Sequence, residues 1–220
     1  MSSKEIKDLA KEKIKGNIWN LLWPVLIIYV ITSVLTNFFG PKIIIDANSL
    51  ENLKDLNLSE MYTEGNSVIT FIISMISAIL TACYMKYVLN FIRKGKFDTN
   101  DIINTLKEKW LDLLIANILT SLIVGIGFAL LIIPGIIASL ALAMINYFII
   151  DQNAKGSDSM KLSNEAMKGH KGELFVFRLS FIGWFILVPF TFGLLLIWLI
   201  PYTKVAEALY YDKIIAPKKK

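Results

Sequence analysis

Six long runs of apolar residues constrain the fold of this 220-residue chain more than any other feature. They lie at about 18–39, 68–92, 111–133, 136–150, 174–189 and 193–211. A helix needs roughly 20 predominantly apolar residues to cross the hydrocarbon core of a bilayer. Because lipid offers no hydrogen-bond partner to the backbone, such runs form helices, and none shows the two-residue alternation of a membrane barrel. The sequence therefore predicts an all-α fold, a polytopic membrane bundle of six transmembrane helices in one domain, residues 1–220.

The composition agrees with this fold and excludes several classes of protein. Charged residues make up 19% of the chain, below the roughly 25% of ordinary globular domains. This excludes a disordered chain, a coiled coil and an ordinary water-soluble enzyme. A single cysteine and a single histidine exclude a disulfide framework and a Cys/His metal cluster, so we expect no metal and no cofactor.

Lysine and arginine gather in alternate connecting segments. Basic residues are frequent before the first run, after the second and fourth runs, and at the C-terminus, whereas 40–66 is acidic overall. The positive-inside rule then places both termini in the cytoplasm and 40–66 outside the cell membrane. The first run is longer than the apolar part of a signal peptide and lacks a small-residue cleavage site, so we expect an uncleaved helix. Anionic lipid accounts for the basic excess, and no nucleic-acid partner is expected.

The odd-numbered runs begin alike, with an amphipathic stretch before an aromatic start flanked by lysine. The apolar faces of these stretches are Ile6, Leu9, Ala10 and Ile14; then Ile102, Ile103, Leu106 and Trp110; then Met160, Leu162, Ala166 and Met167. The pattern predicts three tandem hairpins, each preceded by a short cytoplasmic interfacial helix. The same order of basic, aromatic and apolar residues also recurs in unrelated polytopic proteins.

The C-terminal half carries a recognisable set of motifs. They are Ile133-Pro134-Gly135-Ile136, Asp151, Met167-Lys168-Gly169-His170-Lys171, Leu179-Ser180-Phe181-Ile182-Gly183-Trp184 and Pro201-Tyr202. With them the chain resembles the bacterial integral-membrane family catalogued as domain of unknown function 975. The resemblance covers essentially the whole chain and is most specific over 133–212. It implies a multi-span helical membrane protein and brings no established activity, cofactor or catalytic residue.

Two opposite charges lie at matching depths in the last two runs. Arg178 and Glu207 each sit about 7–8 Å inside the cytoplasmic end of their run, at 1.5 Å per helical residue. A charge at that depth must reach the interface or find a partner, so we predict an ion pair between antiparallel neighbours. Lys204, on the same face as Glu207, is the competing partner, which would leave Arg178 to lipid phosphate.

Other polar residues in the runs have two interpretations. The candidates for a polar pathway or for helix packing are Asn117, Thr120, Ser121, Asn146 and Asp112. Small and polar residues spaced by four let helices approach and hydrogen-bond, which favours packing. A pathway lined by Asn117, Thr120 and Asn146 is the alternative.

Three residues near the fifth run are candidates for lipid headgroup contacts: Lys168, His170 and Lys171. A solvated loop histidine is the simpler interpretation of His170. Cys83 lies inside the second apolar run, which lacks the electropositive and accessible setting of a reactive thiol, so we expect it to serve in helix packing. The chain has no Ser/His/Asp set, HExxH motif or P-loop, so we expect no catalytic residues.

These observations favour a non-enzymatic membrane protein that acts through protein or lipid contacts, of an accessory, immunity or envelope-stress type. The expected partners are membrane lipid and another membrane protein or a second copy of the chain. A small transporter or lipid-handling protein is the alternative, and an intramembrane enzyme is a third. In the outer segment, Leu50, Leu53 and Leu56 predict one face of a short helix.

Overall fold

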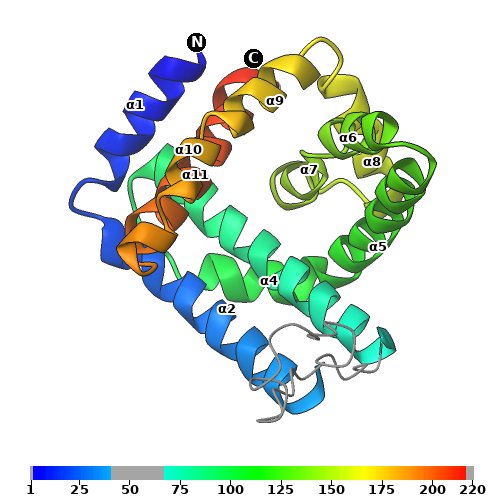
Figure 1. Ribbon diagram of the computed structural model, residues 1–220, viewed down its shortest axis with the longest axis horizontal. Coiled ribbons are helices and arrows are strands. Elements are labelled where there is room, and N and C mark those ends of the chain that lie inside the picture. Colours follow the sequence, from blue (N-terminus) through cyan, green and yellow to red (C-terminus); the bar gives the residue numbers. More distant parts are fainter. Residues whose placement is uncertain (1, 41–66, 217–220) are drawn as a thin grey trace, which may run out of the picture.

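The computed structural model describes residues 2–40 and 67–216, and all regular structure in these ranges is helical (Figure 1). The elements are α1 (Ser3–Ile14), α2 (Ile18–Phe39), α4 (Ser67–Lys94), α5 (Asn100–Leu130), α6 (Ile132–Ala141), α7 (Ile145–Gln152), α8 (Gly156–Ala166), α9 (Lys171–Leu179), α10 (Ile182–Ile186), η1 (Pro189–Thr191), α11 (Leu196–Tyr210) and η2 (Tyr211–Ile215). The helix expected at 50–56 lies outside the described residues.

Within the described part of the chain, four helices are long and apolar enough to cross a membrane. They are α2, α4, α5, and α6 with α7 taken together as Ile132–Gln152. They correspond to the first four expected spans, and α2 has the predicted bounds. The apolar runs therefore form helices, as their length requires in lipid.

The last two runs are built from shorter pieces. Residues 174–189 fall in α9, α10 and the start of η1, and residues 193–211 fall mainly in α11. Ring pairs join the two segments: Phe177–Tyr210 at 5.1 Å and Trp184–Trp198 at 5.4 Å between centroids. Because residue numbers rise along one segment as they fall along the other, the segments run antiparallel. Six complete spans in three tandem hairpins stay a prediction.

The first amphipathic stretch forms a helix, as predicted, and its cytoplasmic interfacial position stays a prediction. Helix α1 begins with a capping box, in which the Ser2 hydroxyl accepts from the Glu5 amide at 3.3 Å and Glu5 accepts from the Ser2 amide at 2.8 Å. It buries Ile6, Ala10 and Ile14, and it packs against α11 rather than only beside its own span (Figure 1). The first and last parts of the chain are therefore joined.

The second expected interfacial helix does not exist as a separate element. Residues 100–130 form one continuous helix, because neither glycine nor proline interrupts the sequence from 100 to 124. Ile103 and Trp110, expected on a buried face, are exposed. The amphipathic stretch is thus an extension of the third span.

Helix α8 buries most of the predicted face and small residues beside it. Of the predicted residues, Met167 is buried, Met160 and Ala166 are partly buried against the core, and Leu162 is exposed. The residues that α8 buries within its own bounds are Gly156, Ser159 and Ser163. The Ser163 hydroxyl donates to the carbonyl of Ala141 at 2.8 Å and accepts from the amide of Met144 at 3.2 Å. These are backbone groups at the break between α6 and α7, which have no regular helical partner. The small face of α8 therefore repairs this break.

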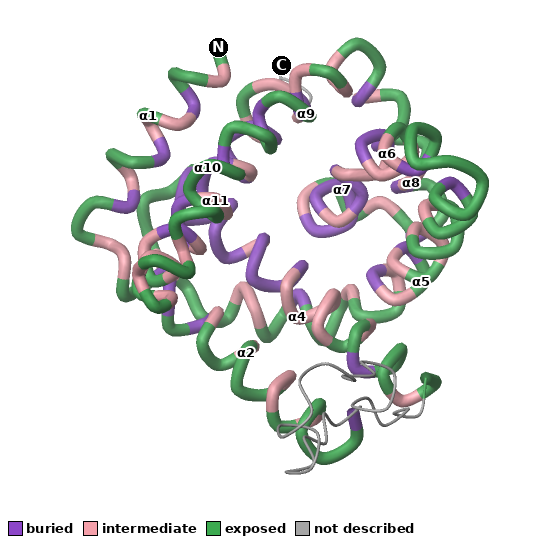
Figure 2. The backbone as a smooth tube through the Cα atoms, in the orientation of Figure 1, coloured by how far each residue is buried: buried purple, intermediate pink, exposed green. Residues whose placement is uncertain are grey.

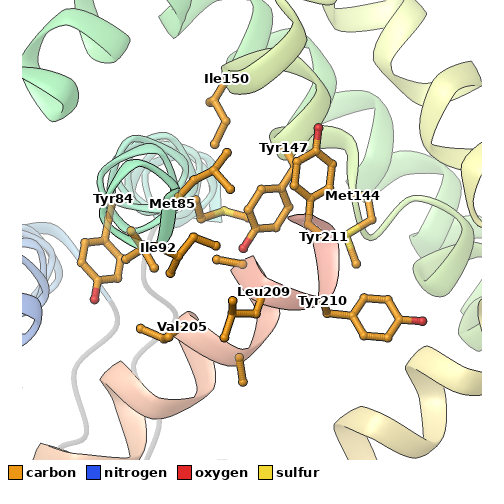
Figure 3. Packing of buried hydrophobic residues seen from close by; sticks show 14 of the residues in the cluster. Tyr84, Met85, Ile92, Met144, Tyr147, Ile150, Val205, Leu209, Tyr210 and Tyr211 are labelled. Atoms are coloured by element: carbon orange, nitrogen blue, oxygen red, sulfur yellow. The ribbon is translucent and has the colours of Figure 1, made fainter. Parts of the chain in front are cut away.

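Tyrosines fill much of the core. Figure 2 shows buried residues concentrated in the second half of α4, in α7 and in α11. Six of the eight tyrosines are fully buried, and Figure 3 shows four of them: Tyr84, Tyr147, Tyr210 and Tyr211. A buried tyrosine hydroxyl needs a hydrogen-bond partner. Tyr84 satisfies this need by donating to the carbonyl of Leu21 at 2.8 Å.

Tyr87 compensates for a proline inside α2. Pro24 has no amide hydrogen, so the carbonyl of Asn20, four residues earlier, loses its helical donor. The Tyr87 hydroxyl donates to this carbonyl at 2.8 Å. This bond joins α2 to α4 at the point where α2 lacks a backbone hydrogen bond. Membrane helices tolerate proline when a neighbouring helix satisfies the freed carbonyl in this manner.

Replacing Tyr87 by phenylalanine should lower the free energy of unfolding by about 1 kcal/mol, the scale of interhelical hydrogen bonds in membranes. In a Pro24→Ala background the loss should be much smaller, because the alanine amide donates to Asn20 instead. Thermal unfolding in detergent, followed by a thiol-reactive dye on the buried Cys83, measures both. Tyr29→Phe, at a tyrosine that is 67% exposed on α2, is the matched control. Equal losses in both backgrounds would contradict this account.

Candidate functional site

Arg93 joins the ends of three helical segments. From the end of α4 its guanidinium holds Asp151 of α7 through two contacts, Nη1–Oδ1 at 2.5 Å and Nη2–Oδ2 at 3.0 Å. Its Nε donates to Oδ1 of Asp212, in η2, at 2.6 Å. Two-pronged contacts between arginine and carboxylate are among the strongest hydrogen bonds in proteins. We call Arg93, Asp151 and Asp212 the rim cluster.

Neighbouring polar groups complete the rim cluster. The Tyr211 hydroxyl donates to Oδ2 of Asp151 at 3.0 Å and accepts from the Gln152 amide at 3.2 Å. Lys213 approaches the second carboxylate oxygen of Asp212 at 3.0 Å. Two positive charges thus balance two negative ones, and the aspartate side chains are only 13% and 14% exposed. This arrangement suits a structural clamp better than a ligand site.

The rim cluster was not predicted from the sequence, where Asp151 appears only among the family motifs and the segment after the second run only as basic. The signal was present, because all three residues lie at the predicted cytoplasmic ends of even-numbered runs. The argument from matched depth that pairs Arg178 with Glu207 applies equally to them.

The structure brings Arg178 and Glu207 together. Arg178 Nη2 lies 3.2 Å from Glu207 Oε1, and Lys204 Nζ lies 3.5 Å from Glu207 Oε2. Lys204, expected to compete for Glu207, instead shares it through the other oxygen. The two cations exceed the single carboxylate by one charge.

This ion group opens into a pocket of about 350 Å³. We call it the basic pocket, and its lining residues are Arg178, Phe181, Phe185, Ile200, Thr203, Lys204 and Glu207. The Arg178 side chain is 42% exposed and that of Lys204 is 32% exposed, against 21% for Glu207. The cations are therefore more open to a ligand than the carboxylate, and apolar side chains stand beside them.

Of the five candidates for a polar pathway, two meet across helices. Asn117 donates to the Asn146 side chain at 3.3 Å and to the carbonyl of Leu113 at 2.7 Å. The Thr120 hydroxyl donates to the carbonyl of Ala116, in its own helix, at 2.7 Å. These contacts are typical of helix packing.

The other two candidates have local roles. Asp112 accepts from the amide of Gly156 at 3.1 Å and so holds the start of α8 against α5. Ser121 is exposed and donates to the carbonyl of Ile118, in its own helix, at 2.8 Å. The close approach between α5 and α6 occurs at Gly127, where an added Cβ would lie 3.0 Å from the Gly135 Cα.

The candidate headgroup residues lie on the turn before α9. His170 Nδ1 is 3.2 Å from Glu173 Oε2, and the His170 carbonyl accepts from the Tyr210 hydroxyl at 3.5 Å. Lys168 is exposed and Lys171 is half-buried. Among the described residues, no group of three or more His, Cys, Asp or Glu side chains is arranged to hold a metal ion.

Comparison with known proteins settles the family. The model of the family described as "Protein of unknown function (DUF975)" matches residues 1–138 and 126–218. The chain belongs to this family. It is also 29% identical over 137 residues to a UPF0259 membrane protein of Buchnera aphidicola subsp. Acyrthosiphon pisum (strain Tuc7), a match that covers 60% of this chain and 53% of the relative.

The chain thus spans about half the length of that curated relative. No solved structure matches it. The relative's name and the four apolar helices agree that this DUF975 chain is a membrane protein from a family of unknown function.

Charge exchange tests the pair in the basic pocket. Arg178→Glu should lower the free energy of unfolding by about 2 kcal/mol, because it places two carboxylates together in a partly buried site. Adding Glu207→Arg should restore much of this loss. Thermal unfolding of the purified variants measures both effects. Lys107→Glu, an equal charge change at an exposed position of α5, is the control. A double variant no more stable than the single one would show that the pair does not stabilise the fold.

Proposed function

We propose that this chain is a non-enzymatic multi-pass membrane protein that acts through contacts with lipid and with other membrane proteins, in an accessory, immunity or envelope-stress role. The observation that carries the proposal is the basic pocket, where the exposed Arg178 and the partly exposed Lys204 stand beside apolar side chains. A membrane lipid combines a charged headgroup with apolar chains, so this combination fits a lipid contact.

The polar groups inside the described spans support a contact role. Asp112, Asn117 and Thr120 all bond to groups of the protein itself. The rim cluster likewise balances its own charges. The side chains that face outward are mainly apolar. A protein of this kind acts by what its surface binds.

The rim cluster also supports six spans with both termini in the cytoplasm. Arg93, Asp151 and Asp212 follow the second, fourth and sixth apolar runs. If both termini are cytoplasmic, these three runs all cross inward and end on the same side. Their contact through one guanidinium supports this topology, because it places the three ends together. Lysines of α1 would then face anionic lipid on that side.

Extraction of the protein with its surrounding membrane in polymer nanodiscs tests the proposed role. We expect the extracted chain to enrich an anionic phospholipid or a defined membrane protein over the bulk membrane, because a contact role requires a preferred neighbour. Lipid analysis and protein mass spectrometry measure the enrichment, with an unrelated polytopic protein as control. A lipid and protein environment equal to that of the control would contradict the proposal.

A further inference from the structure

We infer that the basic pocket holds one anionic phospholipid, with its headgroup phosphate on Arg178 and Lys204 and an acyl chain against Phe181, Phe185 and Ile200. This inference rests on the proposed function and names the ligand class of its site.

The charges of the pocket fit a phosphate group. Glu207 uses one oxygen for Arg178 and the other for Lys204, and so holds the two cations on either side of itself. A guanidinium presents several N–H donors in a planar fork that matches phosphate, and an ammonium adds a point charge. With one carboxylate for two cations, the group keeps one excess positive charge for an anionic ligand.

The walls of the pocket fit an acyl chain. Phe185 is 47% exposed and stands beside the buried ring of Phe181, giving an apolar wall next to the cations. Farther along the same segment, Phe190 and Phe192 are among the most exposed apolar residues described. An apolar surface therefore leads from the charged group toward the hairpin turn, which the proposed topology places on the far side of the membrane.

The size of the pocket agrees with this ligand. A pocket of about 350 Å³ holds a headgroup and the start of a chain, within the roughly 300–1,000 Å³ range of small-molecule sites. A free phosphate ion would use the cations and leave the apolar wall without a ligand.

Native mass spectrometry of the full chain in detergent tests the inference. The probes are dioleoylphosphatidylglycerol, dioleoylphosphatidylcholine and inorganic phosphate. We expect one phosphatidylglycerol to bind in preference to phosphatidylcholine, and Arg178→Gln to weaken its binding about tenfold, the effect of losing one hydrogen bond to a charged group. Lys107→Gln, which removes an exposed lysine of α5 outside the pocket, should leave binding unchanged.

A second variant covers the case in which Arg178→Gln fails to fold because Glu207 is left with a single cation. The double variant Arg178→Gln with Glu207→Gln removes one positive and one negative charge, so the net charge of the pocket does not change. This variant should fold and bind phosphatidylglycerol weakly. Phe185→Ser should weaken phosphatidylglycerol and leave phosphate unaffected.

Three results would overturn the inference: equal binding of both lipids, unchanged binding in both arginine variants, or inorganic phosphate that displaces the lipid at similar concentration. If nanodisc extraction still finds a preferred neighbour, those results refute the pocket assignment and leave the proposed function in place.

Discussion

The guanidinium of Arg93 holds together three segments that are far apart in the chain. It pairs with Asp151, 58 residues later, and with Asp212, 119 residues later. A partly buried charge is costly unless it is paired and hydrogen-bonded, so the three helix ends must stay together. Tyr211 extends the cluster inward, because its hydroxyl bonds to Asp151 while its ring stacks on Tyr147 at 4.6 Å. The rim cluster is therefore connected to the tyrosine core, of which Figure 3 shows Tyr147 and Tyr211.

Side-chain hydrogen bonds also repair the irregular places in the helices. The carbonyl freed by Pro24 accepts from Tyr87, and the break between α6 and α7 is bridged by Ser163. In hydrocarbon, water is not present to form a hydrogen bond with an unpaired backbone group. Each irregularity in a helix therefore needs a side-chain donor or acceptor nearby. Polar residues in the core therefore stabilise the irregular helices of this fold through hydrogen bonds. The basic pocket differs from these sites because its cations are open to a ligand.

The sequence predicts the parts of this structure that depend on local pattern. Apolar length places α2 and three further membrane-length helices, and matched depth pairs Arg178 with Glu207. The sequence alone does not predict the features that depend on which helices pack against one another. The small face of α8 is buried because α5 and the α6–α7 break lie against it, which the periodicity of α8 alone does not reveal. The meeting of Arg93 with two aspartates likewise depends on how the segments pack.

The stability of Arg93 variants tests most directly whether the rim cluster holds the helix ends together. Arg93→Gln should lower the free energy of unfolding by about 3 kcal/mol, because it removes the guanidinium to which both partly buried carboxylates bond. Adding Asp151→Asn and Asp212→Asn should recover most of that loss, since the charges that needed a partner are gone. Thermal unfolding in lipid nanodiscs, followed through exposure of Cys83, measures both variants. A single variant as stable as the natural chain, or a triple variant as unstable as the single one, would contradict the account.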